Sequence, residues 1–110
     1  MPTRTKTLVA LLAALPAIAT SAAQAAADDA QKLYTRSVAA TCANCHGTDG
    51  RAVDDATVPG LAGMSADYIA TQMEAFKKGE RHGTIMHQIA KGFNEEQTRQ
   101  LAEYFASQQR

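Results

Sequence analysis

The chain carries two cysteines and a histidine in the run Cys42-Ala43-Asn44-Cys45-His46, and it has no other cysteine. Two residues between the thiols let both sulfurs reach the vinyl groups on one edge of a porphyrin. The adjacent imidazole can turn beneath the ring and ligate its iron. A C-x-x-C-H spacing is typical of c-type haem attachment. The sequence therefore predicts one covalent haem c, held by Cys42 and Cys45 through thioethers and by His46 at the iron.

The same residues are compatible with three other sites: a redox-active C-x-x-C pair, a zinc site and a structural disulfide. A zinc site could take His82 and His87 as its remaining ligands. However, 36 residues separate Cys45 from His82, whereas the usual zinc pattern has about a dozen at that point. The long interval weakens the zinc interpretation, and the alternatives stay open on the motif alone.

The first 27 residues show the three parts of a secretory signal peptide. Arg4 and Lys6 make a basic start, residues 8–19 are apolar apart from one proline, and small residues at 23–27 offer a cleavage site. The apolar run is too short for a spanning helix, which needs roughly 20 residues. We therefore expect residues 1–27 to be removed, leaving a periplasmic protein without a membrane span. In that oxidising compartment a free C-x-x-C pair would tend to close into a disulfide unless haem occupied it.

The composition of the mature chain, which we expect to be residues 28–110, limits its possible functions and the size of its core. Nine basic and eleven acidic residues remain after cleavage, giving a formal charge of −2. This balance argues against nucleic-acid binding, which depends on Lys and Arg neutralising phosphates. A tryptophan-free chain of this size predicts one small domain with a thin apolar core. A buried haem would add a large apolar plate to such a core.

The mature chain shows helix signals separated by glycine-containing loops and no convincing strand. Asp28 or Asp29 can cap a first helix that delivers Cys42 at its end. Residues 48–63 lack helical periodicity and contain Pro59-Gly60, so they predict a loop. A loop of this length in a small domain is usually functional, which fits a sheath around a ligand.

Three later segments predict helices. Ser65 can cap a helix that ends at Lys77-Lys78-Gly79, where cations and a glycine suit a helix C-terminus. A short helical turn is expected at residues 85–90. Asn94 and Gln97 resemble the capping box of a last helix. The apolar faces of the two longer helices are predicted at Ile69, Met73, Phe76, Leu101, Tyr104 and Phe105.

The order of these parts resembles the class I cytochromes c over nearly all of residues 30–108. The resemblance rests on the Cys42–Gly47 motif, on Pro59-Gly60-Leu61-Ala62-Gly63, on Met86 before Ile89-Ala90-Lys91-Gly92, and on an aromatic-bearing last helix. It implies an all-α fold in which the first and last helices cross, bringing Tyr34 and Val38 near the last helix. It also implies that the Pro59 carbonyl accepts the proton on the other nitrogen of His46, which fixes the imidazole.

The residues alone leave five candidates for a sixth iron ligand: Met64, Met73, Met86, His82 and His87. Met73 lies on an apolar helix face and is expected to fill the core, and Met64 is expected to pack over the haem edge. The two histidines lie in a polar loop and are expected to be solvated. The family places its ligand at the position of Met86, so the resemblance implies that this methionine is the axial ligand.

A histidine and a methionine together favour ferrous iron and raise the reduction potential. With His46 and Met86 in place, no position is left for oxygen or substrate, so we expect an electron carrier that is not an enzyme by itself. Basic residues bracket the Met86 segment and could orient an acidic partner, although ordinary solvated helix ends would look the same. These residues are Lys77, Lys78, Arg81 and Lys91.

Three blocks, Leu61–Ile69, Phe76–Arg81 and Met86–Phe93, look like the small haem subunit of flavocytochrome c sulfide dehydrogenases. This resemblance implies a sulfide-oxidising, FAD-containing flavoprotein as the redox partner. Two alternatives remain. One is a free soluble cytochrome c that carries electrons to a terminal oxidase or another acceptor, and the other is a peroxidase-like haem enzyme with a labile Met86 bond.

Overall fold

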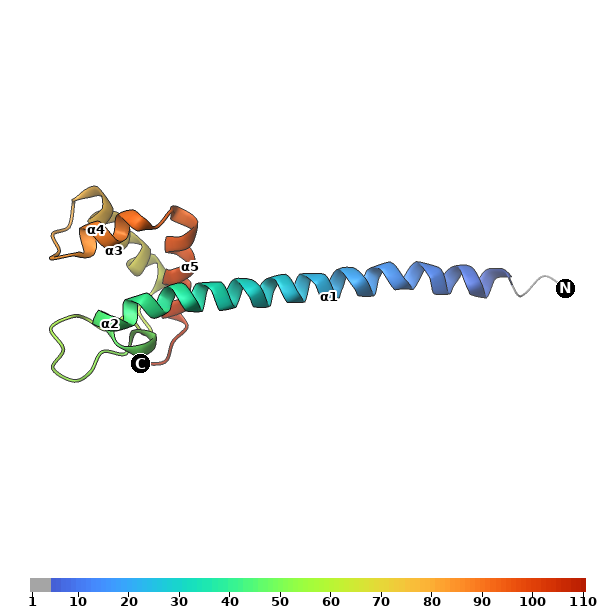
Figure 1. The fold of residues 1–110 in the computed structure, drawn as a ribbon, viewed down its shortest axis with the longest axis horizontal. Coiled ribbons are helices and arrows are strands. Elements are labelled where there is room, and N and C mark those ends of the chain that lie inside the picture. The colour runs from blue at the N-terminus through green and yellow to red at the C-terminus, as the bar shows by residue number, and fades with distance from the viewer. Residues whose placement is uncertain (1–4) are drawn as a thin grey trace. The chain divides into compact units, whose positions relative to one another are not determined.

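The computed structural model describes the backbone of residues 5–110 and the side chains of residues 21–110. Over this range the regular structure consists of α-helices and short 3-10 turns, without a strand (Figure 1). The all-α prediction is therefore confirmed. The elements are α1 Thr5–Ala39, η1 Ala40–Cys42, α2 Ala43–His46, η2 Thr48–Gly50, α3 Ala66–Lys78, α4 Met86–Ile89, η3 Ala90–Gly92 and α5 Glu95–Ala106.

The chain divides into two compact units, residues 1–33 and residues 34–110, and α1 crosses the division. No helix begins at Asp28 or Asp29, where a cap was predicted, because α1 already begins at Thr5 and runs through both aspartates. The physical reason is the alanine-rich sequence before them, since alanine has the highest helix propensity. Asp28 and Asp29 therefore lie inside a helix and cap no helix end.

The predicted signal peptide, residues 1–27, includes Arg4, which lies outside the described residues. The small residues of the expected cleavage region, 23–27, are exposed and helical. None of the described helices is both long and apolar enough to cross a bilayer. Removal of residues 1–27 stays a prediction.

Helix α3 begins and ends where its capping residues predicted. The Ser65 hydroxyl accepts a hydrogen bond from the Tyr68 backbone N–H at 3.2 Å. Lys77 and Lys78 occupy the last turn, and Gly79 follows with φ 78°, a left-handed conformation that favours glycine. The local signals for this helix were therefore sufficient.

Helix α5 starts with the predicted capping box. The Asn94 side chain accepts from the Gln97 N–H at 2.8 Å, and the Gln97 side chain accepts from the Asn94 N–H at 3.1 Å. Leu101 and Phe105 are buried as predicted. Ala102, only 1% exposed, belongs to the same face but was not predicted, because an alanine gives little periodic signal. The turn predicted at 85–90 forms α4 and the start of η3.

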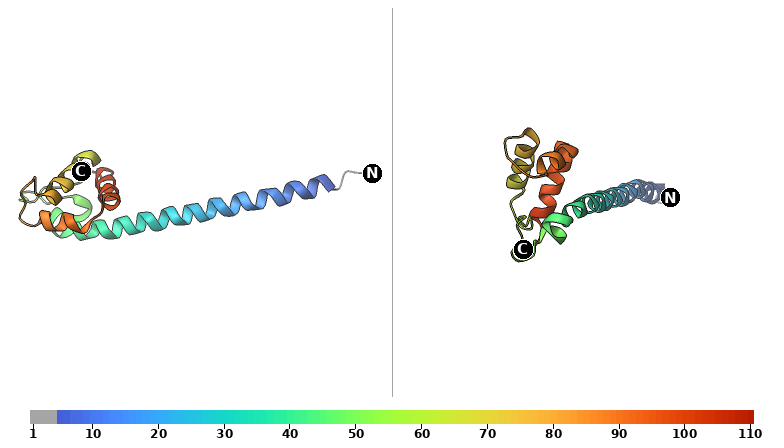
Figure 2. Two further views of the ribbon diagram at one scale, coloured as in Figure 1. Left: turned by 90° about the horizontal axis from the view of Figure 1, so that it is seen from above. Right: turned by 60° about the vertical axis from the view of Figure 1, so that its left-hand side comes forward.

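The core lies where α3 and α5 pack together with the last residues of α1, as the views in Figure 2 agree. Its buried members are Ala39, Ile69, Leu101, Ala102 and Phe105. Val38 packs against this cluster, and the Tyr34 hydroxyl accepts a hydrogen bond from the Gln97 side chain at 2.8 Å. The first and last helices therefore meet as expected. The core is thin, since no large described side chain is less than 2% exposed.

Candidate haem site

His46 is the buried polar residue among the described side chains, with 8% of its surface exposed. It ends the one-turn helix α2, and its Nδ1 lies 2.7 Å from the Pro59 carbonyl oxygen. A carbonyl can only accept, so this bond requires the hydrogen on Nδ1. The lone pair is then on Nε2, which is the form of imidazole that binds a metal.

The Pro59 carbonyl is positioned by hydrogen bonds that its own loop makes. The Gly50 oxygen accepts from the Leu61 N–H at 2.7 Å and from the Ala62 N–H at 3.0 Å. The Gly63 N–H donates to the Phe105 oxygen at 2.9 Å, which ties the same loop to α5. The imidazole orientation therefore depends on contacts between segments far apart in the sequence.

Cys42 is half-buried at the end of η1, Cys45 is exposed on α2, and both are free thiols. Burial raises the pKa of the Cys42 thiol, and the nearby Cys45 adds to this, while a hydrogen bond with Thr41 opposes it. The thiol form is therefore favoured at neutral pH. Cys42 lies four residues before His46 and Cys45 directly before it, and two free thiols so close to a metal-competent imidazole suit thioether formation with a bound haem.

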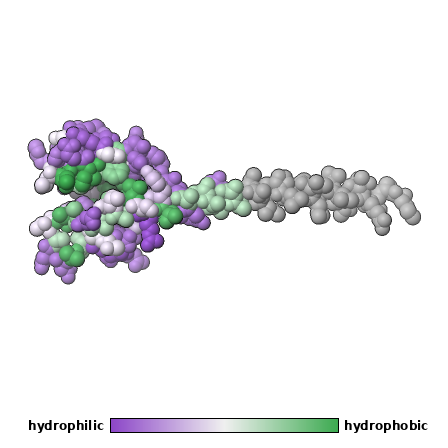
Figure 3. Space-filling model, viewed as in Figure 1, coloured by the Kyte–Doolittle hydropathy of each residue, from purple (hydrophilic) through white to green (hydrophobic). Residues whose placement is uncertain are grey.

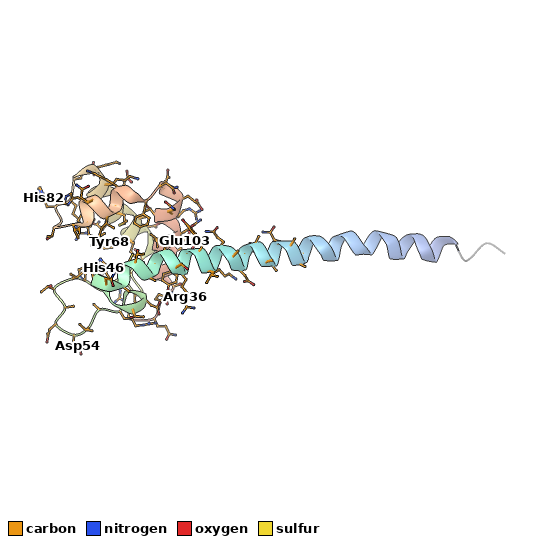
Figure 4. All side chains as sticks on the ribbon, in the orientation of Figure 1. Arg36, His46, Asp54, Tyr68, His82 and Glu103 are labelled. Carbon is orange, nitrogen blue, oxygen red and sulfur yellow. The ribbon has the colours of Figure 1, made fainter. Side chains whose placement is uncertain are left out.

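The zinc alternative fails on geometry. Within the part of the chain that the structure describes, no group of three or more His, Cys, Asp or Glu side chains could hold a metal ion. Figure 4 shows His82 at the outer tip of the turn after α3, pointing away from His46. The ligands that a Cys₂His₂ site would need are therefore not brought together.

Met86 is half-buried and begins α4. Met64 and Met73 both pack against the core cluster, which was the expectation for Met73. His82 is exposed as predicted, but His87 is half-buried, with its Nδ1 2.9 Å from the Gly83 carbonyl oxygen. His87 is therefore less solvated than expected, because its ring bonds to the backbone of the turn before α4.

The domain is hollowed on the face shown in Figure 3, between the part that carries α3 and α4 and the part that carries α2 and the following loop. Apolar residues gather at this hollow. The large apolar side chains that α4 and its cap leave exposed are Ile85 at 55% and Ile89 at 37%. A flat apolar group would cover such surface, so the residues present fit a haem.

A network that was missed from the sequence braces the loop behind His46. The Tyr104 hydroxyl donates to Asp49 Oδ1 at 2.6 Å, and Arg51 approaches Asp49 Oδ2 at 3.3 Å and the Gln109 oxygen at 2.8 Å. The Tyr104 bond, followed by the Arg51 contacts, lowers the pKa of Asp49. Burial, followed by the Asp49 contact, raises the pKa of Tyr104. Nothing in the sequence pairs residues 55 positions apart.

Three of the four basic residues around Met86 already have partners inside the domain. Lys77 bonds to the Phe93 oxygen, Lys78 pairs with Glu74, and Arg81 contacts Phe76 and Gln72. The predicted basic collar is therefore only partly available to a partner. Lys91 is exposed.

Residues 27–109 match the family model described as cytochrome c. The chain belongs to the cytochrome c family. It is 42% identical over 67 residues to the cytochrome subunit of sulfide dehydrogenase of Chlorobaculum tepidum, covering 61% of this chain and 59% of that protein. It is 40% identical over 78 residues to the thiosulfate dehydrogenase electron acceptor of Stutzerimonas stutzeri, covering 67% and 36%. The chain thus spans less than two thirds of the length of each of these relatives.

A solved cytochrome c4 from Acidithiobacillus ferrooxidans has the same fold, with a TM-score of 0.56 and 39% identity over 60% of this chain and 37% of that one. Cytochromes c bind covalent haem c, so this protein is a haem-containing member of that family. The haem supplies a one-electron iron couple. The protein supplies an oriented imidazole, two thiols and an apolar wall.

Proposed function

We propose that Cys42 and Cys45 form the two thioethers to haem, and that His46 and Met86 fill the axial positions. The observation that carries this proposal is the buried His46 ring, held through Nδ1 by the Pro59 carbonyl at 2.7 Å. Met86 is supported by its half-buried place at the start of α4, whose neighbouring isoleucines are exposed. With both axial positions filled, the protein transfers electrons and does not itself convert a substrate.

We further propose that the protein is exported, loses residues 1–27 and works in the periplasm as residues 28–110. Its proposed partner is a sulfide-oxidising flavoprotein that contains FAD and passes electrons to this haem. The similarity to a sulfide dehydrogenase cytochrome subunit supports this partner. The similarity to a thiosulfate dehydrogenase electron acceptor favours a second candidate, a free carrier that serves thiosulfate oxidation.

The two candidates are separated by reduction kinetics of the purified ferric holoprotein. Sulfide alone is expected to reduce it slowly, and a catalytic amount of the flavoprotein is expected to make reduction fast. Thiosulfate with the same flavoprotein serves as the substrate control. Reduction that is fast only with thiosulfate and its dehydrogenase would replace the sulfide proposal. Rapid peroxide turnover by the cytochrome alone would favour the peroxidase-like alternative.

Docking is tested at Lys91, which is exposed, whereas Lys77 and Arg81 bond within the domain and Lys78 pairs with Glu74. Lys91→Glu is expected to slow electron transfer from the flavoprotein and to flatten its dependence on salt, because exposed charges act mainly on the encounter rate. Lys32→Glu is the matched charge reversal at another exposed lysine, outside the compact unit that carries Lys91. Equal effects of the two variants would show that net charge matters and the position of Lys91 does not.

A further inference from the structure

The segment that carries Met86 is fastened to α3 at both of its ends. We name residues 79–93 the distal segment. At its C-terminal end, the Lys77 ammonium donates to the Phe93 carbonyl oxygen at 2.7 Å. At its N-terminal end, the Arg81 guanidinium lies 4.7 Å from the centre of the Phe76 ring and also bonds to the Gln72 side chain.

Each fastening uses a cation that would otherwise be solvated. Lys77 is half-buried, and its charge is directed at a backbone oxygen instead of outward. Hydrogen bonds with a charged donor are stronger than neutral ones, and a guanidinium over an aromatic face adds a cation–π attraction. Lys78, the next residue on α3, makes only an exposed ion pair with Glu74 at 3.4 Å. Such surface pairs contribute little.

Between the two fastenings, the distal segment has its own internal bonds. The His87 ring bonds to the Gly83 oxygen at 2.9 Å, and the N–H groups of Gln88 and Ile89 both donate to the Ile85 oxygen. The N–H groups of Glu80 and Arg81 donate instead to the Ala75 oxygen of α3, beside the Arg81 fastening. The segment is therefore braced within itself, and its two ends are attached to α3.

We propose that Lys77 and Arg81 are positioning residues for Met86. They hold the distal segment against α3 and thereby set how often the methionine leaves the iron and an external ligand can enter. This inference rests on the proposed role of Met86 as axial ligand. On this inference, Lys77 and Arg81 stabilise the position of Met86 and do not serve partner docking.

The size of the effect follows from the population of the open form. An external ligand that binds only the open form has an apparent dissociation constant equal to its intrinsic value divided by the open fraction. Loss of one hydrogen bond with a charged donor is expected to raise that fraction about tenfold. The apparent dissociation constant for imidazole should then fall about tenfold.

The test is imidazole titration of the ferric holoprotein, followed by the Soret absorption. Lys77→Met should bind imidazole about tenfold more tightly than the wild type, and Lys77→Arg, which keeps a charged donor, should restore most of the difference. Lys78→Met removes the same charge one residue away and should leave the affinity unchanged. Arg81→Leu releases the other end of the segment and should also tighten imidazole binding. It provides the test if Lys77→Met does not accumulate as holoprotein.

Two outcomes separate this inference from the proposed ligand. If Met86→Ala retains the near-infrared absorption of a sulfur–iron bond, the axial ligand is another residue and the proposal fails with it. If Met86→Ala loses that absorption, but Lys77→Met and Arg81→Leu bind imidazole no better than Lys78→Met, the ligand stands and the positioning role is wrong.

Discussion

Gly50 packs closely against residues 61–62 and Phe105, and replacing it with alanine should be strongly destabilising. Its φ of 77° is left-handed, and an added Cβ would lie 2.9 Å from both the Ala62 nitrogen and a Phe105 ring carbon. The Gly50 oxygen also accepts the two hydrogen bonds that hold the loop after Pro59. The substitution therefore meets both backbone strain and a steric clash.

The two contributions can be added. A left-handed conformation costs a residue with a Cβ about 1–2 kcal/mol. Overfilling a packed site costs about 1–3 kcal/mol more. Gly50→Ala should therefore lower the free energy of unfolding by about 2–5 kcal/mol, which is a large part of the ~5–15 kcal/mol typical of a small domain.

Two other glycines separate these contributions. Gly79 has φ 78° with nothing within 4 Å of an added Cβ, so Gly79→Ala carries the conformational cost alone, about 1 kcal/mol. Gly92 also has nothing within 4 Å and lacks a positive φ, so Gly92→Ala should be close to neutral. The three variants should therefore rank in the order Gly92, Gly79 and Gly50.

The assay is unfolding of the ferric holoprotein in guanidinium chloride, followed by far-ultraviolet circular dichroism. With a slope of about 2 kcal/mol per molar, Gly50→Ala should lower the midpoint by about 1–2.5 M and Gly79→Ala by about 0.5 M. If Gly50→Ala costs no more than Gly79→Ala, the close packing of the 47–50 loop against residues 61–62 and Phe105 is refuted.

Three further predictions address the ligand, the Asp49 network and the core. Met86→Ala should abolish the near-infrared absorption of the ferric protein and let cyanide bind the iron, whereas Met64→Leu and Met73→Leu should keep that absorption. If the spectrum changes only when His82 or His87 is substituted, the site is bis-histidine. The hydrogen bond from Tyr104 lowers the pKa of Asp49 below its ordinary 3.8, so this bond stabilises the fold above pH 3.8, and the stabilisation is lost as pH falls through the folded pKa. Tyr104→Phe should therefore lower the free energy of unfolding at pH 7 and have little effect in acid. A difference between variant and wild type that stays the same at all pH values would contradict the pairing. Leu101→Ala should cost about 2–5 kcal/mol, measured by the same unfolding assay beside the exposed Gln109→Ala.

Elements with local start and stop signals were predictable from the sequence. Ser65 and Asn94 each bond to backbone within three residues, so the information that begins α3 and α5 is contained in a few neighbouring residues. Gly79 ends α3 for the same kind of reason. The beginning of α1 was predicted wrongly, because an alanine-rich leader and the helix after it share one propensity and no break separates them.

The thiol and imidazole positions of the site followed from their spacing, whereas the contacts that hold the site did not. Met86 as axial ligand came from family resemblance, since the residues alone left several candidates. The Tyr104 to Asp49 bond joins residues 55 apart, and the Lys77 to Phe93 bond joins residues 16 apart. Such pairings depend on how α3 and α5 pack, so no local pattern could reveal them.

The central claim is that Cys42, Cys45 and His46 hold one covalent haem. The most direct measurement is the mass of the denatured, exported protein after acid-acetone extraction, with Cys42→Ser and Cys45→Ser in parallel. The wild type should retain the mass of one haem on a single peptide that contains both cysteines, and each variant should retain at most one thioether. A colourless protein with both thiols free, joined in a disulfide or bound to stoichiometric zinc would contradict the claim.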